Sequence, residues 1–161
     1  MFKVRADFSE PFEVKASLKK VRAFFTDIKN LIDLMPSIES IHIDSGEIIH
    51  WKIRVDVPFI GSFTEKFSVF EVENSDERVE WSPVEDERFN LLRYSADYLP
   101  KGKSKTLVQF SQNIELRRNS AADLHLLAGL AGEGLISSEM TKGISEMMHV
   151  FLEKAKQRLE S

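Results

Sequence analysis

The chain contains no cysteine among its 161 residues. This absence excludes a disulfide framework, a thiolate nucleophile and any zinc site with cysteine ligands, and it suits a reducing compartment. The four histidines stand at positions 42, 50, 125 and 149, and no two have the i, i+4 spacing of an HExxH helix. We therefore expect no bound metal, and nothing in the sequence implies a cofactor.

A basic excess and a long apolar run are also missing. The 22 Lys and Arg residues are fewer than the 26 Asp and Glu residues, and the formal charge is −4. Nucleic-acid-binding domains usually carry a basic patch or stripe, so no nucleic-acid partner is expected. The first residues, MFKVRADFSE, lack the apolar stretch of a signal peptide. These features predict a cytoplasmic protein, and the length suits one domain spanning residues 1–161.

Catalytic motifs are absent as well, and one unusual segment raises a structural question. No GxSxG sequence occurs, which leaves a hydrolase nucleophile elbow without support. The stretch AADLHLLAGLAGEGLISSEM has glycines at 129, 132 and 134, in an order that matches neither a P-loop nor a dinucleotide-binding loop. Its apolar part, residues 124–136, is shorter than the about 20 residues of a membrane-spanning helix. The segment Ala121–Leu135 is therefore either a packed helix or a mobile cover hinged around Gly132–Gly134.

Alternating apolar and polar residues predict a series of strands. The clearest alternation runs from Ile49 to Val57, where apolar residues occupy every second position. Similar patterns predict a first strand that Pro11 interrupts, at residues 2–8 and 12–16, and further strands at 38–44, 62–73, 78–84, 89–99 and 105–118. Short strands joined by short turns are typical of an antiparallel sheet.

Helical periodicity marks three further segments. Ser17 is a suitable N-cap for a helix over residues 18–28, and a second short helix over 29–35 ends before Pro36. From Ile136 onward, apolar residues recur at helical spacing as far as Leu159, which predicts an amphipathic helix of about 24 residues, roughly 36 Å long. The predicted class is α+β, with one strand, two short helices, six strands and a long final helix.

This order and several sequence stretches resemble the START-like helix-grip superfamily of polyketide cyclases/dehydrases and lipid-transport proteins. The stretches are FEVKASLKKVRAFFTDIKNLIDLMPSIESIHI, the strands around VEWSPV, and the long helix after VQFSQNIELRR. TDIKNLIDLMPSIESI is similar to the matching part of coenzyme Q-binding proteins and of one family of carbon monoxide dehydrogenase subunits. The resemblance covers residues 11–159. It implies a curved seven-stranded sheet that grips the C-terminal helix, with an apolar cavity between them for a lipid, quinone or polyketide.

The candidate ligand-binding residues come from the strand faces and the helix stripe that would enclose this cavity. They are Trp51, Ile53, Val55, Phe63, Glu65, Phe67, Trp81, Leu92, Tyr94, Phe110, Gln112, Met140, Gly143, Ile144 and Met147. Apolar stripes of this kind form protein cores more often than binding sites. The resemblance is what favours a binding site here, and no catalytic residue is matched.

Glu65 and Gln112 are the two polar residues that interrupt apolar strand faces. A buried polar group requires a hydrogen-bond partner, because leaving it unpaired costs a few kcal/mol. Each side chain therefore either binds an oxygen of a ligand or is satisfied within the protein. In the second case we expect Glu65 to lie at a rim or to pair with Arg93 or Lys66, and Gln112 to bond to the backbone.

Gly143 stands on the predicted apolar stripe of the long helix, between Met140 and Met147. A glycine within a helix costs about 1 kcal/mol relative to alanine. Either it allows close packing of the helix on a strand, or it leaves room for a ligand. We adopt the second interpretation.

Three functions are compatible with these features. We favour the binding or transport of a small hydrophobic molecule. A cyclase- or dehydratase-like enzyme using Glu65, Tyr94 or Gln112 is the first alternative, and an assembly or interaction protein is the second. Arg117 and Arg118 are either solvated or in contact with anionic lipid headgroups at a membrane surface. The sequence leaves the oligomeric state open.

Overall fold

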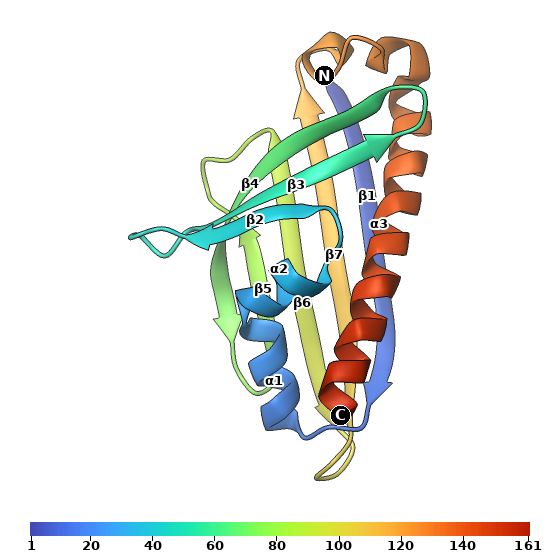
Figure 1. The fold of residues 1–161 in the computed structure, drawn as a ribbon. Helices are drawn as coiled ribbons and strands as arrows, with labels where there is room; N and C mark the ends of the chain where they lie inside the picture. The colour runs from blue at the N-terminus through green and yellow to red at the C-terminus, as the bar shows by residue number, and fades with distance from the viewer.

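A computed structural model describes residues 1–161 as one seven-stranded antiparallel sheet with three α-helices (Figure 1). The sheet order is β1-β7-β6-β5-β4-β3-β2. The elements are β1 (Phe2–Val14), α1 (Leu18–Thr26), α2 (Ile28–Leu34), β2 (Ile38–Ile43), β3 (Ile49–Val57), β4 (Gly61–Asn74), β5 (Arg78–Pro83), β6 (Asn90–Pro100), β7 (Thr106–Arg118), a 3-10 turn (Ala121–Asp123) and α3 (Ala128–Glu160). The predicted α+β class and element order are confirmed.

All three helices cover the same face of the sheet, and the core lies between them and the strands. Phe25 of α1 packs against Phe110 of β7 and Phe151 of α3, with ring centroids 5.9 Å and 6.2 Å away. Ser17 caps α1 as predicted, since its hydroxyl accepts a hydrogen bond from the Lys20 backbone N–H at 3.3 Å. No helix is long and apolar enough to cross a membrane.

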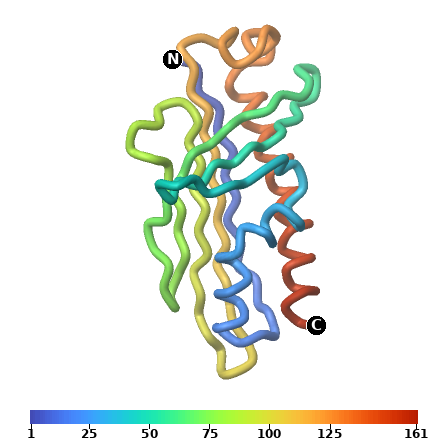
Figure 2. The backbone as a smooth tube through the Cα atoms, turned by 60° about the vertical axis from the view of Figure 1, so that its left-hand side comes forward, coloured from blue at the N-terminus to red at the C-terminus, as the bar shows by residue number.

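Helix α3 runs beside β1 and caps its outer edge with side chains (Figures 1 and 2). The Ser137 hydroxyl accepts from the Arg5 backbone N–H at 3.0 Å, and the Glu160 carboxylate accepts from that of Lys15 at 2.9 Å. Backbone groups on an edge strand would otherwise stay unpaired and available to another chain. The helix therefore protects this edge.

The predicted interruption of β1 at Pro11 is wrong. The strand is continuous, and Pro11 pairs with Gln109 of β7 without a change of register. Residues 3, 5 and 15 direct their N–H groups away from β7 toward α3. Because backbone N–H directions alternate along a strand, the missing N–H of Pro11 falls on this outer side, where no ladder hydrogen bond is lost.

The start of the long helix also differs from the prediction, which placed it at Ile136. Helix α3 begins at Ala128, and it is broken at Gly132, where φ is 82° and ψ is 161°. This left-handed conformation is costly for residues other than glycine. A short turn therefore precedes a straight helix over residues 133–160, and the predicted kink near Gly132–Gly134 is confirmed.

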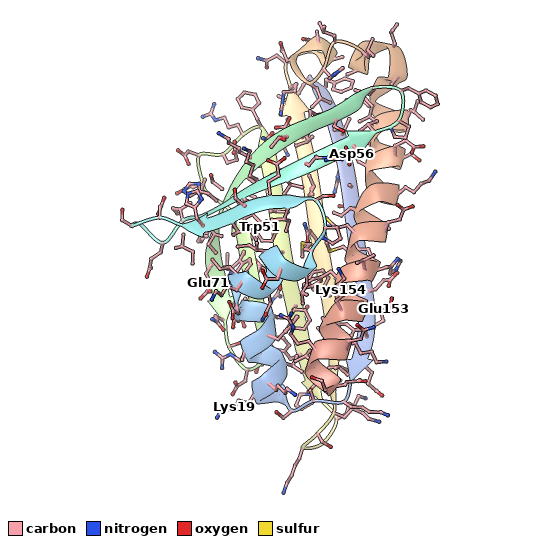
Figure 3. The ribbon with its side chains drawn as sticks, in the orientation of Figure 1. Lys19, Trp51, Asp56, Glu71, Glu153 and Lys154 are labelled. Carbon is pink, nitrogen blue, oxygen red and sulfur yellow. The ribbon has the colours of Figure 1, made fainter.

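Replacing Phe151 tests the contact between α3 and the sheet. Phe151 is fully buried, and its ring contacts those of Phe24, Phe25 and Phe110. We expect Phe151→Ala to lower the free energy of unfolding by about 3–5 kcal/mol, through lost burial and the cavity that remains. Exposed Glu153, two residues on, provides the control (Figure 3), and Glu153→Ala should change the value by about 0.5 kcal/mol or less. Urea denaturation measures both, and equal effects would contradict this packing.

Candidate ligand-binding groove

A groove of about 780 Å³ lies between α3 and the hairpin formed by β3 and β4. Figure 1 shows β3 and β4, at the curled end of the sheet, crossing in front of β7 and β1, with their connecting turn beside α3. The floor of the groove comes from Ala6 of β1 and Ile114 of β7, which pair across the sheet. We call this space the α3 groove. The resemblance implies an enclosed cavity between the helix and the sheet, whereas this groove is partly open to solvent and is bordered mainly by α3 and the β3–β4 hairpin.

Six of the predicted ligand-binding residues line the α3 groove. Ile53 and Val55 contribute from β3, and Met140, Gly143, Ile144 and Met147 contribute from α3. The two β3 residues share the inward face of their strand, and the α3 residues recur at helical spacing. Sequence periodicity therefore identified the two walls that face each other.

A second group of predicted residues lies in the closed core instead. No member of this group is more than 1% exposed, and none lines the groove. The group consists of Trp51, Phe67, Trp81, Leu92, Tyr94, Phe110 and Gln112. Most are rings packed on other rings; for example, Trp81 and Tyr94 stack with centroids 4.6 Å apart.

The end of the β3–β4 hairpin, which was not among the predicted binding residues, forms the outer rim of the groove. The rim residues from this hairpin are Arg54, Asp56, Val57, Pro58, Phe59, Gly61 and Ser62. Phe59 has a positive φ of 72° and is 89% exposed. An aromatic residue in a Pro-Phe-Ile-Gly turn was the available signal, because such turns usually consist of polar residues.

Charged residues stand on both sides of the rim. Asp56 of β3 accepts hydrogen bonds from the Ser62 hydroxyl and, at 3.1 Å, from Arg54 Nε. These bonds hold the pKa of Asp56 below its ordinary value, so its carboxylate is ionised near neutral pH. Figure 3 shows Asp56 near the end of β3, beside α3. Glu139, Lys142 and Glu146 line the opposite side from α3. The rim therefore carries charges of both signs beside the exposed Phe59, above an apolar floor.

Phe63 and Glu65 lie outside the groove, and Glu65 belongs to a closed set of polar contacts. Its carboxylate accepts from Arg118 Nη2 at 2.9 Å and from Asn90 Nδ2 at 2.8 Å, while Arg118 Nη1 donates to Asn90 Oδ1 at 2.8 Å. The Glu65 and Arg118 side chains are 13% and 14% exposed. The expected pairing of Glu65 with Arg93 or Lys66 is wrong. Arg93 faces the opposite side of the sheet and donates to Ser82 Oγ. Lys66 takes part only through its backbone carbonyl, which accepts a hydrogen bond from Asn90 Nδ2.

Gln112 is fully buried, and neither its Oε1 nor its Nε2 has a hydrogen-bond partner. The expected bond to the backbone is therefore wrong. Tyr94, its neighbour across β6 and β7, already donates its hydroxyl to the Phe25 carbonyl at 3.0 Å. Burial raises the pKa of Tyr94 well above its ordinary value, so this hydroxyl stays protonated.

The segment Ala121–Leu135 does not border the groove, so its interpretation as a cover of the binding site is wrong. Ala128 is fully buried, and Ala121, Leu124 and Ala131 pack against the core. Their outward neighbours Leu126 and Leu130 are 86% and 87% exposed. The segment is a packed turn and helix start that closes one end of the molecule, and the hairpin turn borders the groove instead.

Ser68, His50 and Asp44 form a hydrogen-bonded chain on the opposite face of the sheet. His50 Nδ1 lies 3.0 Å from Ser68 Oγ, and His50 Nε2 lies 2.8 Å from Asp44 Oδ2. The bond from His50 is the main cause that lowers the pKa of Asp44. Because His50 alternates with inward-facing Trp51, this chain lies away from the groove and holds the β2–β3 turn to β4. No group of three or more such side chains is arranged to hold a metal ion.

A second hollow, of about 710 Å³, lies beside α1. Only two of its ten lining residues are hydrophobic, and the others include Lys19, Arg22, Asn74 and Asp76. Small-molecule sites are mainly apolar with a few convergent polar groups. The α3 groove fits this description better.

Comparison with solved structures identifies the fold as the START-like helix-grip fold. The Zhui aromatase/cyclase from Streptomyces sp. R1128 has a TM-score of 0.65 at 13% identity, covering 98% of this chain and 97% of that chain. A START superfamily protein from Mycobacterium smegmatis has a TM-score of 0.63 at 12% identity, covering 95% and 98%. The di-domain aromatase/cyclase StfQ of the steffimycin pathway has a TM-score of 0.64 at 10% identity, and this chain spans about half (51%) of its length. No family model and no curated protein sequence matches the chain.

Replacing Arg118 tests whether Glu65 is held by a structural contact. Arg118→Met leaves a largely buried carboxylate without its cation, so we expect a loss of roughly 1–3 kcal/mol in the free energy of unfolding. Arg117 is the control, because it pairs with Glu115 at a more exposed position. Arg117→Met should cost less than about 1 kcal/mol. Urea denaturation at neutral pH measures both, and equal losses would show that the Glu65 contact is not special.

Proposed function

We propose that the α3 groove binds a small, largely apolar molecule. The groove itself is the observation that carries this proposal: a space of about 780 Å³ with an apolar floor, apolar side chains on both walls and charged side chains at its rim. Binding sites for small molecules typically have volumes of about 300–1,000 Å³ and this distribution of polarity. A lipid, a quinone or a polyketide-like aromatic compound has the required chemistry. Two of the structural neighbours described above are aromatase/cyclases, which supports the aromatic class.

The methionines and the glycine of α3 support the same proposal. An added Cβ at Gly143 would meet no atom within 4 Å, so no strand packs closely against this point of the helix. Met140 and Met147 flank it and line the groove. Methionine side chains are flexible and polarisable, and they adapt to ligands of varied shape. Gly143 lowers the stability of the helix, and what it leaves in return is open space on the groove side.

An enzymatic function of the cyclase or dehydratase type is the second candidate, favoured only by the likeness to aromatase/cyclases. Two of the polar side chains considered for it are used elsewhere, since Glu65 is paired with Arg118 and Tyr94 donates to Phe25. A role in assembly rests on the exposed Leu126 and Leu130. A standard protein–protein interface buries roughly 800 Å² on each partner, and two leucines supply much less area than this. We therefore place this role third.

Native mass spectrometry of protein purified from its source tests the proposed function. We expect a co-purified lipid, quinone or aromatic compound bound at one molecule per chain and released by organic solvent. A mass equal to the bare chain, together with no binding of hydrophobic fluorescent probes, would contradict the proposal.

Substitution of Gly143 tests the location of the site. Gly143→Leu places a side chain in the open space of the groove, so the melting temperature should hold or rise as helix propensity improves. Binding of the probe 1-anilinonaphthalene-8-sulfonate should weaken by roughly tenfold or more, which corresponds to about 1.4 kcal/mol. Gly143→Ala is the matched control, with a similar gain in helix propensity and little added volume. A clear fall in melting temperature for the leucine variant alone would show that this position is already filled.

A further inference from the structure

Gln112 is a buried polar group in an otherwise apolar row of the sheet. Its partners across the neighbouring strands are Phe8 of β1 and Tyr94 of β6. Along β7, its neighbours on the same face are Phe110 and Ile114. The side chain is 0% exposed, and both of its polar atoms lack a partner. An unpaired buried amide typically costs about 1–3 kcal/mol, so this arrangement destabilises the protein unless something binds the amide.

The position of Gln112 places this amide next to the floor of the α3 groove. Ile114, two residues along the same face of β7, is part of the floor together with its cross-strand partner Ala6. Phe110, two residues in the other direction, belongs to the closed aromatic core with Phe25 and Phe151. Gln112 therefore stands at the boundary between the groove and the packed core.

Contacts between β1 and α3 place Gln112 at the same level of the helix. Thr141 of α3 reaches the Arg5 carbonyl, and His149 bonds to Glu10 at 2.8 Å. Phe8, which pairs with Gln112, lies between these two points of β1. The matching part of α3, between Thr141 and His149, includes Ile144 and Met147, and both line the groove.

A second unpaired donor lies in the same layer. The indole N–H of Trp51 is buried and has no partner. The Trp51 ring packs against Tyr94 with a centroid distance of 6.2 Å, and Tyr94 is the direct neighbour of Gln112. Ile53, two residues from Trp51 on the same face of β3, lines the groove. Gln112 and Trp51, which both have unpaired polar atoms, therefore both neighbour Tyr94, and each stands two residues from a residue that lines the groove.

We infer that Gln112 recognises a neutral oxygen, a ketone or hydroxyl group, at the buried end of the groove's ligand. This inference rests on the proposed function. The carboxamide provides both a donor and an acceptor, so it matches a ketone oxygen through Nε2 and a hydroxyl through either atom. A carboxylate is disfavoured, since a neutral amide does not compensate for the burial of a full charge. Gln112 does not line the groove, so side chains must move for the ligand to reach it, and Met140 and Met147, which do line the groove, are flexible.

Two matched probes and two matched variants test this inference. 2-Acetylnaphthalene carries a ketone, and 2-ethylnaphthalene has nearly the same shape without it. Gln112→Leu removes the amide at similar volume. Gln109→Leu is the control: it lies three residues earlier on β7, on the opposite face, where its amide donates to Ser9 Oγ at 2.9 Å. Calorimetric titration gives the four affinities relative to the wild type, and thermal melts give the stability of each unliganded protein.

We expect Gln112→Leu to weaken binding of the ketone by about tenfold, the value of one hydrogen bond, while the hydrocarbon binds as well as before or better. The unliganded variant should melt at the same temperature or higher, because an unpaired polar group has been removed. Gln109→Leu should leave both affinities unchanged.

Three results would overturn the inference. Equal changes in affinity for both probes on Gln112→Leu would show that the amide does not read the ketone, with the groove still a binding site. A fall in melting temperature of the unliganded variant would show that Gln112 is satisfied within the protein, for example by an internal water. Failure of both probes to bind the wild type would remove the proposed function and this inference with it.

Discussion

The docking of α3 along β1 is the contact on which both the core and the groove depend. The lower part of the helix, from Met148 to Leu159, packs into the aromatic core through Phe151. The part from Met140 to Met147 faces the α3 groove. Ser137 accepts a hydrogen bond from the backbone of β1, and Glu160, at the end of the helix, accepts one from Lys15, the residue directly after β1. These contacts fix the helix to the edge strand. The width of the groove therefore depends on how closely the β3–β4 hairpin approaches α3.

The same geometry explains why two interior polar residues have different surroundings. Glu65 lies where the start of β6 and the end of β7 bring Asn90 and Arg118 together, so its charge is matched by a cation and an amide. Gln112 lies in the middle of β7, between Phe8 and Tyr94, where the neighbouring strands supply rings. A buried polar group is stable only with partners. The chain supplies no hydrogen-bond partner for Gln112, so one would have to be supplied by a bound molecule.

The shared fold and the function carry separate arguments. At 10–13% identity, the likeness to aromatase/cyclases and to a START superfamily protein extends over nearly the whole chain and establishes the helix-grip architecture. One architecture supports many functions, and function depends on the particular site. In this chain, the proposed site has an apolar floor at Ala6 and Ile114, methionines and a glycine on α3, and a rim with charges of both signs.

Local sequence patterns were enough to predict the individual helices and strands and the faces that point inward. Ser17 as a helix cap, the alternation from Ile49 to Val57 and the stripe of the last helix are local signals, because backbone geometry alone sets periods of 3.6 and 2 residues. Depth is not local. Ile53 borders the groove, whereas Trp51, two residues earlier on the same face, lies in the core. Glu65 pairs with Arg118, which is 53 residues away in the sequence. Pro11 falls on the outer side of an edge strand. These outcomes depend on sheet order, on curvature and on the place where α3 docks, all of which join residues far apart in the chain.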